Sequence, residues 1–270
     1  MALSFTSLNS GSNGNCYYLA NKDDAILIDA GISCRETEKR MLNLGLPMSK
    51  LRAVFVSHEH IDHIRGIPQL AKKYRLPVYI TKPTLSHSRL NLDADLIRSF
   101  RAHEVVRIGE LAITAFPKFH DASDPHSFTI EHKGFRVGVF TDIGSPCEEV
   151  LRHFRECHSA FLEANYDEDL LERGRYPYHL KARIRGGKGH LSNRQALDLF
   201  CKNGMHMNHL LLSHLSGDNN NPETVMKMFS EVTSGTKIIV ASRDRESELY
   251  HIGEYTQAVK QPEYIQYNLF

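Results

Sequence analysis

Three histidines and an aspartate crowd into one six-residue stretch, His58-Glu59-His60-Ile61-Asp62-His63. The stretch directly follows the apolar run 53–56, whose short length and content of valine and phenylalanine indicate a buried strand. Side chains at positions i, i+2, i+4 and i+5 cannot share one face of a helix, so we expect all four on a loop leaving the strand. A loop can fold imidazoles and a carboxylate around two neighbouring metal ions.

Two other interpretations of this stretch are weaker. A chance cluster is conceivable in a chain with 16 histidines, but its position right after a predicted strand disfavours chance. The zincin pattern His-Glu-x-x-His also fails, because Asp62 stands where its second histidine belongs. The stretch therefore predicts a metal site. Its ligand types accept zinc, manganese, iron or nickel and do not choose among them.

Further candidate ligands follow other predicted strands, and their order along the chain resembles one family. Asp29, Asp142 and His214 each come where an apolar run ends, so their side chains can converge at one sheet edge. With His120 and the stretch 58–63, they resemble the five motifs of the metallo-β-lactamase superfamily, in family order. An aspartate after a strand is usually a turn residue or helix cap, but the complete set disfavours that interpretation.

The resemblance implies two divalent metal ions, zinc or manganese being favoured over iron or nickel. Asp29 would lie behind the ligands and orient one imidazole by accepting its free ring N–H. Two cations about 3.5–4 Å apart would deprotonate a shared water, and the hydroxide would attack while Asp62 held it in line. The resemblance implies that His58, His60 and His120 bind the first ion. It implies that Asp62, His63 and His214 bind the second ion, and that Asp142 bridges the two. The imidazole of His60 favours hydrolysis, because the family's di-iron oxidoreductases carry a carboxylate there.

A basic segment points towards phosphodiesters as substrates. Six cations occupy residues 173–188 with no acid among them: Arg173, Arg175, Lys181, Arg183, Arg185 and Lys188. Tyr176 and Tyr178 lie between them, and aromatic rings among cations suit the bases and phosphates of a nucleic-acid strand. The segment ends at glycines before a helix start predicted at Ser192, and both features favour a phosphate. The alternative interpretation is a solvated charged loop.

The next residues, Gly189-His190-Leu191-Ser192 with Gln195 and Ala196, resemble a stretch of ribonuclease Z. That resemblance implies that His190 protonates the leaving group or stabilises the scissile phosphate, with Glu163 as its acidic partner. Nearly the whole chain resembles the YycJ (WalJ) group of the superfamily, through residues 8–18, 120–125 and 162–166. The group is associated with 5′-to-3′ exonuclease activity on DNA. The stretch between Asp142 and His214 is too short for the inserted domain of ribonuclease J-type nucleases.

The order of predicted elements indicates an α/β (α+β) protein forming one domain, residues 1–270, without a linker. The resemblance implies a four-layer αββα sandwich of two mixed sheets with helices outside. We expect helices at 33–45, 67–74 and 192–204, two of them opened by capping boxes at Ser33 and Ser192. Strands are expected at 3–8, 16–20, 25–29, 53–57, 78–81, 105–108, 111–116, 128–131, 135–140, 160–163, 209–213 and 237–240.

Composition bounds the remaining expectations. The first 20 residues lack the pattern of a signal peptide, and no apolar stretch is long enough to span a membrane. Five cysteines without metal-type spacing suit reduced packing residues in a cytoplasm. The predicted function is a dinuclear metal-dependent nuclease, acting on DNA in preference to RNA. The alternatives are a hydrolase of a small ester, thioester or cyclic phosphodiester, and a non-enzymatic binding role. The sequence does not indicate an oligomeric state.

Overall fold

The central strands are apolar on both faces, which requires a layer on each side of each sheet. In β3 (Ala25–Ile28), Leu27 packs under the outer helices, whereas Ile26 packs between the sheets. In β12 (His209–Ser213), Leu212 faces the helices and Leu211 faces the other sheet. The computed structural model, which describes residues 3–233 and 235–253, meets this requirement with four layers and three apolar cores.

Each sheet has seven strands in the described residues, and both sheets combine the same two patterns of pairing. Three antiparallel pairs are followed by three parallel pairs. The first sheet has the order β14 (Tyr250–Ile252), β1 (Leu3–Asn9), β2 (Cys16–Ala20), β3, β4 (Leu51–Phe55), β5 (Val78–Tyr79), β6 (Ile97–Arg98). The second has the order β7 (Val105–Ile108), β8 (Leu111–Pro117), β9 (His126–His132), β10 (Phe135–Phe140), β11 (Ser159–Glu163), β12, β13 (Lys237–Val240).

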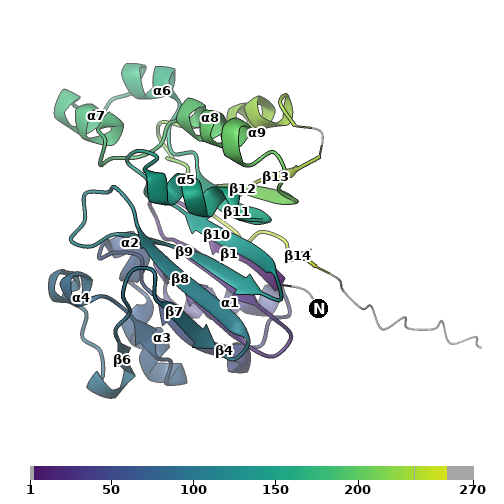
Figure 1. The fold of residues 1–270 in the computed structure, drawn as a ribbon. Coiled ribbons are helices and arrows are strands. Elements are labelled where there is room, and N and C mark those ends of the chain that lie inside the picture. Colours follow the sequence, from purple (N-terminus) through teal and green to yellow (C-terminus); the bar gives the residue numbers. More distant parts are fainter. Residues whose placement is uncertain (1–2, 234, 254–270) are drawn as a thin grey trace, which may run out of the picture.

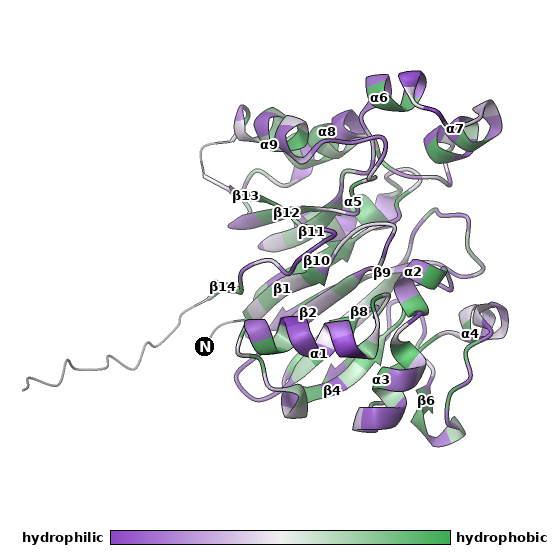
Figure 2. Cartoon of the chain, turned by 180° about the vertical axis from the view of Figure 1, so that it is seen from behind, coloured by the Kyte–Doolittle hydropathy of each residue, from purple (hydrophilic) through white to green (hydrophobic). Residues whose placement is uncertain are grey.

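Helices cover the outer face of both sheets (Figure 1). Over the second sheet lie α5 (Glu148–Arg155), α8 (Asn193–Asn203) and α9 (Pro222–Ser230), and beyond them α6 (Glu168–Arg173) and α7 (Tyr178–Arg185). On the side of the first sheet lie α1 (Cys34–Asn43), α2 (Ile61–Ile64), α3 (Ile67–Tyr74) and α4 (Lys82–Ser88), with short 3₁₀ turns at Met48–Lys50 and Ala94–Leu96. Figure 2 shows mixed hydrophilic and hydrophobic residues on α1 and α3, as expected for helices between a core and water. The predicted αββα sandwich is confirmed.

The predicted helix caps are confirmed in one case and half confirmed in the other. At α8, Ser192 Oγ accepts from the Gln195 backbone N–H at 3.1 Å, and the Gln195 side chain accepts from the Ser192 N–H at 2.9 Å. At α1, Ser33 Oγ accepts from the Glu36 N–H at 3.2 Å, but the Glu36 carboxylate turns to neighbouring cations instead. The α1 helix ends before Gly45, whose φ of +67° explains the glycine.

Three further details complete the fold. The short strands β6 and β14 escaped prediction, because two or three residues carry little periodic pattern. They lie at the two edges of the first sheet, where β6 pairs with β5 and β14 pairs with β1. The cysteines are free, as expected, but Cys201 is exposed and is therefore not a packing residue. No helix in residues 3–233 and 235–253 is long and apolar enough to cross a membrane.

Candidate metal centre

Strands of both sheets end at one edge of the molecule, and the predicted site residues follow these ends. Asp29 follows β3 directly, Asp142 comes two residues after β10, and His214 follows β12. All three adopt left-handed backbone conformations, with φ of +60°, +53° and +56°. Such conformations are uncommon for residues other than glycine and persist where the surrounding structure over-determines them. Both sheets thus contribute to a single site.

Asp62 and His63 lie on the one-turn helix α2, which follows His60. The expectation that all four residues of the stretch lie on a loop is wrong for these two. Consecutive helical residues point about 100° apart, which suffices when only some of the four side chains address the same ion. The close approach of α2 requires Gly31, since a Cβ there would lie 1.7 Å from the Asp62 carbonyl oxygen.

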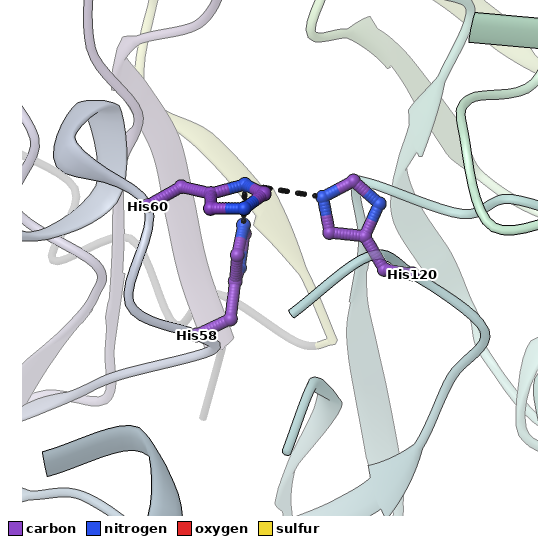
Figure 3. A group of neighbouring side chains, drawn as sticks. All are labelled: His58, His60 and His120. Carbon is purple, nitrogen blue, oxygen red and sulfur yellow. Dashed lines mark hydrogen bonds between the residues drawn. The ribbon is translucent and has the colours of Figure 1, made fainter. Parts of the chain in front are cut away.

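Three imidazoles form the first group of potential metal ligands, here called the first ligand group (Figure 3). His60 Nδ1 lies 3.1 Å from His58 Nε2 and 3.3 Å from His120 Nε2. Burial lowers the pKa of His58, and burial together with the nearby Lys118 ammonium lowers the pKa of His120 to about 4. The rings of His58 and His120 are therefore neutral at neutral pH and keep a lone pair for a metal ion.

The second ligand group combines carboxylates and imidazoles. Asp62 Oδ2 lies 3.5 Å from both His63 Nε2 and His214 Nε2. Asp142 lies between the two groups, with Oδ2 3.1 Å from His63 Nε2 and Oδ1 3.8 Å from His120 Nε2. Burial disfavours the charged form of His63, but the carboxylates of Asp142, Asp62 and Asp29 outweigh it and raise its pKa to about 10. The group is built to attract positive charge.

Two buried atoms test whether cations fit this site. Asp142 Oδ2 and His214 Nε2 are both inaccessible to solvent and make no hydrogen bond of acceptable geometry. Buried polar atoms without partners are costly, and both atoms face the second ligand group. Imidazole nitrogens and carboxylate oxygens in this number suit zinc or manganese. The residues present therefore fit a pair of divalent ions.

Asp29 lies behind the ligands in a network of short hydrogen bonds. Its Oδ1 accepts from the Ser57 backbone N–H at 2.8 Å and its Oδ2 from the Ser57 hydroxyl at 2.7 Å. The same Oδ2 lies 2.7 Å from His63 Nδ1, the ring atom that points away from Asp62. On the other side of the site, His120 Nδ1 lies 3.0 Å from the Gly189 carbonyl oxygen.

Replacing Asp29 with alanine should weaken metal binding by about 10- to 100-fold, because His63 loses the acceptor that orients its ring. Equilibrium dialysis with elemental analysis measures this affinity. The variant Asp24→Ala, at an acid ahead of β3 that pairs with the surface residue Arg52, serves as the control and should bind metal normally. Unchanged affinity in Asp29→Ala would show that the ring is held without this carboxylate.

Glu163, at the end of β11, connects two histidines of the site. Its Oε1 lies 2.7 Å from His190 Nδ1 and 3.0 Å from His214 Nδ1, and its Oε2 accepts from the backbone N–H groups of Ile143 and Leu191. Burial opposes its ionisation, but the two histidines overcome this effect and lower its pKa to about 2. Sequence reasoning paired Glu163 with His190 and missed its contact with His214.

A buried polar network from the amino-terminal segment was also missed. The Asn15 side-chain amide donates to Asp62 Oδ2 at 3.2 Å, and the Tyr17 hydroxyl donates to Asn15 Oδ1 at 3.1 Å. Ser10 Oγ lies 2.8 Å from the Tyr17 hydroxyl and accepts from the His214 backbone N–H at 2.7 Å. The sequence feature that could have indicated this network is the run of asparagine, serine and glycine before the strand. Such runs are common in loops and are therefore not specific.

A cleft of about 390 Å³ opens beside the ligands. Ile61 and Asp62 line it together with Leu180, Arg183 and Ile184 of α7, so the basic segment forms one wall as a helix. Figure 1 shows α2 and α7 on the same side of the molecule, at the left of the view. His190, Asp142 and His214 also line this cleft. The structure thus brings four of the seven predicted ligands, His60, Asp62, Asp142 and His214, to one cavity with His190 and one of the six predicted cations.

The other cations of the segment differ in their surroundings. Arg185 pairs with Glu172, and the Lys181 ammonium donates to the Glu172 carbonyl oxygen; this acid lies just before the segment and was overlooked. Arg173, Arg175 and Lys188 are exposed. At the start of α8, the Ser192 hydroxyl donates to Glu168 Oε1 at 2.9 Å. An acid therefore already occupies the helix end that was expected to favour a phosphate.

Known proteins support the family resemblance. A family model described as a beta-lactamase superfamily domain matches residues 24–215. The chain belongs to the metallo-β-lactamase superfamily. Within this superfamily it is 32% identical to a Bacillus anthracis protein named exodeoxyribonuclease YycJ, over 86% of this chain and 89% of that protein. It is 29% identical to a Streptococcus pneumoniae protein named exodeoxyribonuclease WalJ, over 80% and 82% of the two chains.

A solved structure agrees on the fold of this superfamily member. The metallo-β-lactamase fold protein YhfI from Bacillus subtilis superposes with a TM-score of 0.71 at 20% identity, covering 93% of this chain and 99% of that one. The expected likeness to the YycJ group is confirmed by the two sequence relatives. Family membership and the His/Asp clusters together identify a metal-dependent hydrolase.

Proposed function

We propose that the protein is a nuclease that removes nucleotides from the 5′ end of DNA with two bound divalent ions. The observation that carries this proposal is the lining of one cleft by three kinds of group: metal ligands such as Asp142, the histidine His190, and the cation Arg183. The names of the two sequence relatives support DNA as the substrate. We expect the reaction to occur in the cytoplasm, in keeping with the free cysteines.

The chain's own residues would divide the work of hydrolysis. When bound, two divalent ions would lower the pKa of a shared water and stabilise the charge that develops on the phosphate. Asp62, whose Oδ2 lies between His63 and His214, would orient the attacking water in line with the scissile bond. Arg183 Nε lies 2.5 Å from Asp121 Oδ2. When DNA binds, the guanidinium would leave this carboxylate and donate to a phosphate oxygen of the DNA strand.

In this proposal, His190 would give a proton to the leaving oxygen. Its Nδ1 lies 2.7 Å from Oε1 of the ionised Glu163, a contact that fixes the ring orientation. The other ring nitrogen, Nε2, is then available to the substrate in the cleft that His190 lines. A histidine that is oriented by a carboxylate and faces the leaving group is a usual arrangement for general acid catalysis.

A cleavage assay on end-labelled nucleic acids tests the proposal. The purified protein, loaded with Mn²⁺ or Zn²⁺, is incubated with single- and double-stranded DNA and RNA carrying a label at either end. We expect early release of a labelled mononucleotide only from 5′-labelled DNA. Internal fragments would overturn exonucleolytic cutting, early release from the 3′ label would overturn the direction, and a preference for RNA would overturn the substrate. No cleavage of any strand would overturn the nuclease proposal.

A hydrolase of a small ester or cyclic phosphodiester is the second candidate, because the cleft volume also falls in the range of small-molecule sites. The dependence of substrate binding on ionic strength distinguishes these two candidate functions. Binding of a nucleic-acid strand should weaken steeply with added salt, whereas binding of a small neutral ester should not.

Replacing Arg183 with alanine should weaken DNA binding and reduce the salt dependence of log Kd by about one charge. Arg185→Ala is the matched control, since this residue lies on the same helix but pairs with Glu172 and does not line the cleft. Binding is measured by fluorescence anisotropy at several salt concentrations, and bound metal should be unchanged in both variants. Equal losses in the two variants would mean that α7 contributes only diffuse charge.

A further inference from the structure

A second group of potential metal ligands lies away from the cleft. Glu149 and His153 are four residues apart on α5, so their side chains share one face of the helix. His103, from the turn before β7, completes the group: Glu149 Oε2 lies 3.6 Å from His103 Nδ1 and 3.7 Å from His153 Nε2. One ligand atom of each residue lies within 4.8 Å of the other two. We propose that His103, Glu149 and His153 form a separate site for a divalent transition-metal ion such as zinc.

His153 is held as a ligand before any ion binds. Its ring stacks on Phe116 with centroids 4.0 Å apart and planes at 14°, and its side chain is only 10% exposed. Its Nε2 faces Glu149 and accepts from the Arg152 guanidinium at 3.2 Å, so this atom carries the lone pair that a metal ion requires. Burial and the adjacent Arg152 lower its pKa to about 4, which keeps the imidazole neutral at physiological pH.

His103 is held in place by its backbone. Its N–H donates to the Ala115 carbonyl oxygen at 2.7 Å, which ties the turn to β8, and its φ of +65° is uncommon for a residue other than glycine. Its ring lies nearly parallel to that of His153, at an angle of 13° with centroids 6.5 Å apart. Two imidazoles and a carboxylate from two segments therefore lie side by side, with half of the His103 side chain open to solvent.

A guanidinium already lies against two of these side chains. Arg152 donates to Glu149 Oε2 at 2.7 Å, and the same Nη2 atom lies 3.2 Å from His153 Nε2. The Arg152 side chain is 52% exposed, so it can turn into solvent when an ion takes its place. The site thus attracts positive charge, and Arg152 competes with the metal for both ligands on α5.

An ion held here would connect α5 to the turn that precedes the outer strand of the second sheet. Two nitrogens and one oxygen suit zinc, cobalt or nickel, with water completing the shell. Because such an ion would bind only the folded chain, it would raise the melting temperature. None of its three ligands lines the cleft, so we expect the effect to be on stability and not on turnover.

Metal counting on the full chain tests the proposal. Chelator-stripped protein is titrated with Zn²⁺, and bound zinc is counted by elemental analysis after dialysis at a fixed free concentration. His103→Ala should bind one ion fewer than the unchanged protein and lose part of the zinc-induced rise in melting temperature. His87→Ala, at an exposed histidine on α4, is the control and should keep the full number.

The variant Arg152→Ala should change zinc binding in the opposite direction. Removing the competing cation should tighten binding of the additional ion by roughly tenfold. Equal zinc content in His103→Ala and the unchanged protein, or weaker binding in Arg152→Ala, would overturn the proposal. Because His103→Ala leaves the catalytic ligands intact, a lost ion with normal nuclease activity would place the loss outside the cleft.

Discussion

The variant Asp142→Ala should lose hydrolytic activity by roughly 10³-fold or more, since stabilisation of several kcal/mol is withdrawn from the transition state. Asp142 lies between the two ligand groups, with one oxygen near His63 and the other towards His120. Without it, the buried imidazoles of His63 and His214 lose the carboxylate that attracts positive charge to them. We therefore expect fewer bound ions as well as slower cleavage, measured by elemental analysis and by release of end label.

A matched aspartate separates this effect from general damage. Asp198 lies exposed on α8 and pairs with Lys202 one turn away, so Asp198→Ala should keep both metal and activity. Circular dichroism of both variants checks that the fold is retained. Normal turnover in a folded Asp142→Ala protein would rule out a bridging role for this residue.

The second large effect is expected at His190. The variant His190→Ala should cleave DNA about 10²- to 10⁴-fold more slowly, because the leaving oxygen then departs without a proton. Metal content should be unchanged, since the side chain is 22% exposed at the cleft and Glu163 still holds His214. The rate is measured under single-turnover conditions, so that product release does not mask the chemical step.

An activated substrate makes the role of His190 specific. Bis(p-nitrophenyl) phosphate releases nitrophenolate, which leaves readily without a proton. The His190→Ala variant should therefore cleave it nearly as fast as the unchanged protein does. An equal loss on DNA and on the activated ester would mean that His190 positions the phosphate and is not the acid.

A site residue could be predicted from the sequence when the residues next to it in the chain indicated its position. His58, His60, Asp142 and His214 stand at strand ends, so apolar runs in the sequence locate them directly. The Asn15 contact with Asp62 joins residues 47 positions apart, and no local pattern reports it. The same holds for the Glu163 contact with His214, which depends on the pairing of β11 with β12.

The fold was predictable for a similar reason, and its gaps have a physical cause. Strands buried on both faces, such as β3 and β12, appear as continuous apolar runs. The edge strand β14 has three residues, and its pairing with β1 is set by the chain's return across the first sheet. The charges of the basic segment were visible, but Glu172 and Asp121 become the partners of Arg185 and Arg183 only after folding.

The distribution of ligands over both sheets has a consequence during synthesis. A growing chain presents residues 58–63 well before His214, which lies 151 residues after His63. Translation products that stop before β12 would hold an incomplete set and could not cut the nucleic acids around the ribosome. Such a nuclease would stay inert until β12 and His214 had left the exit tunnel.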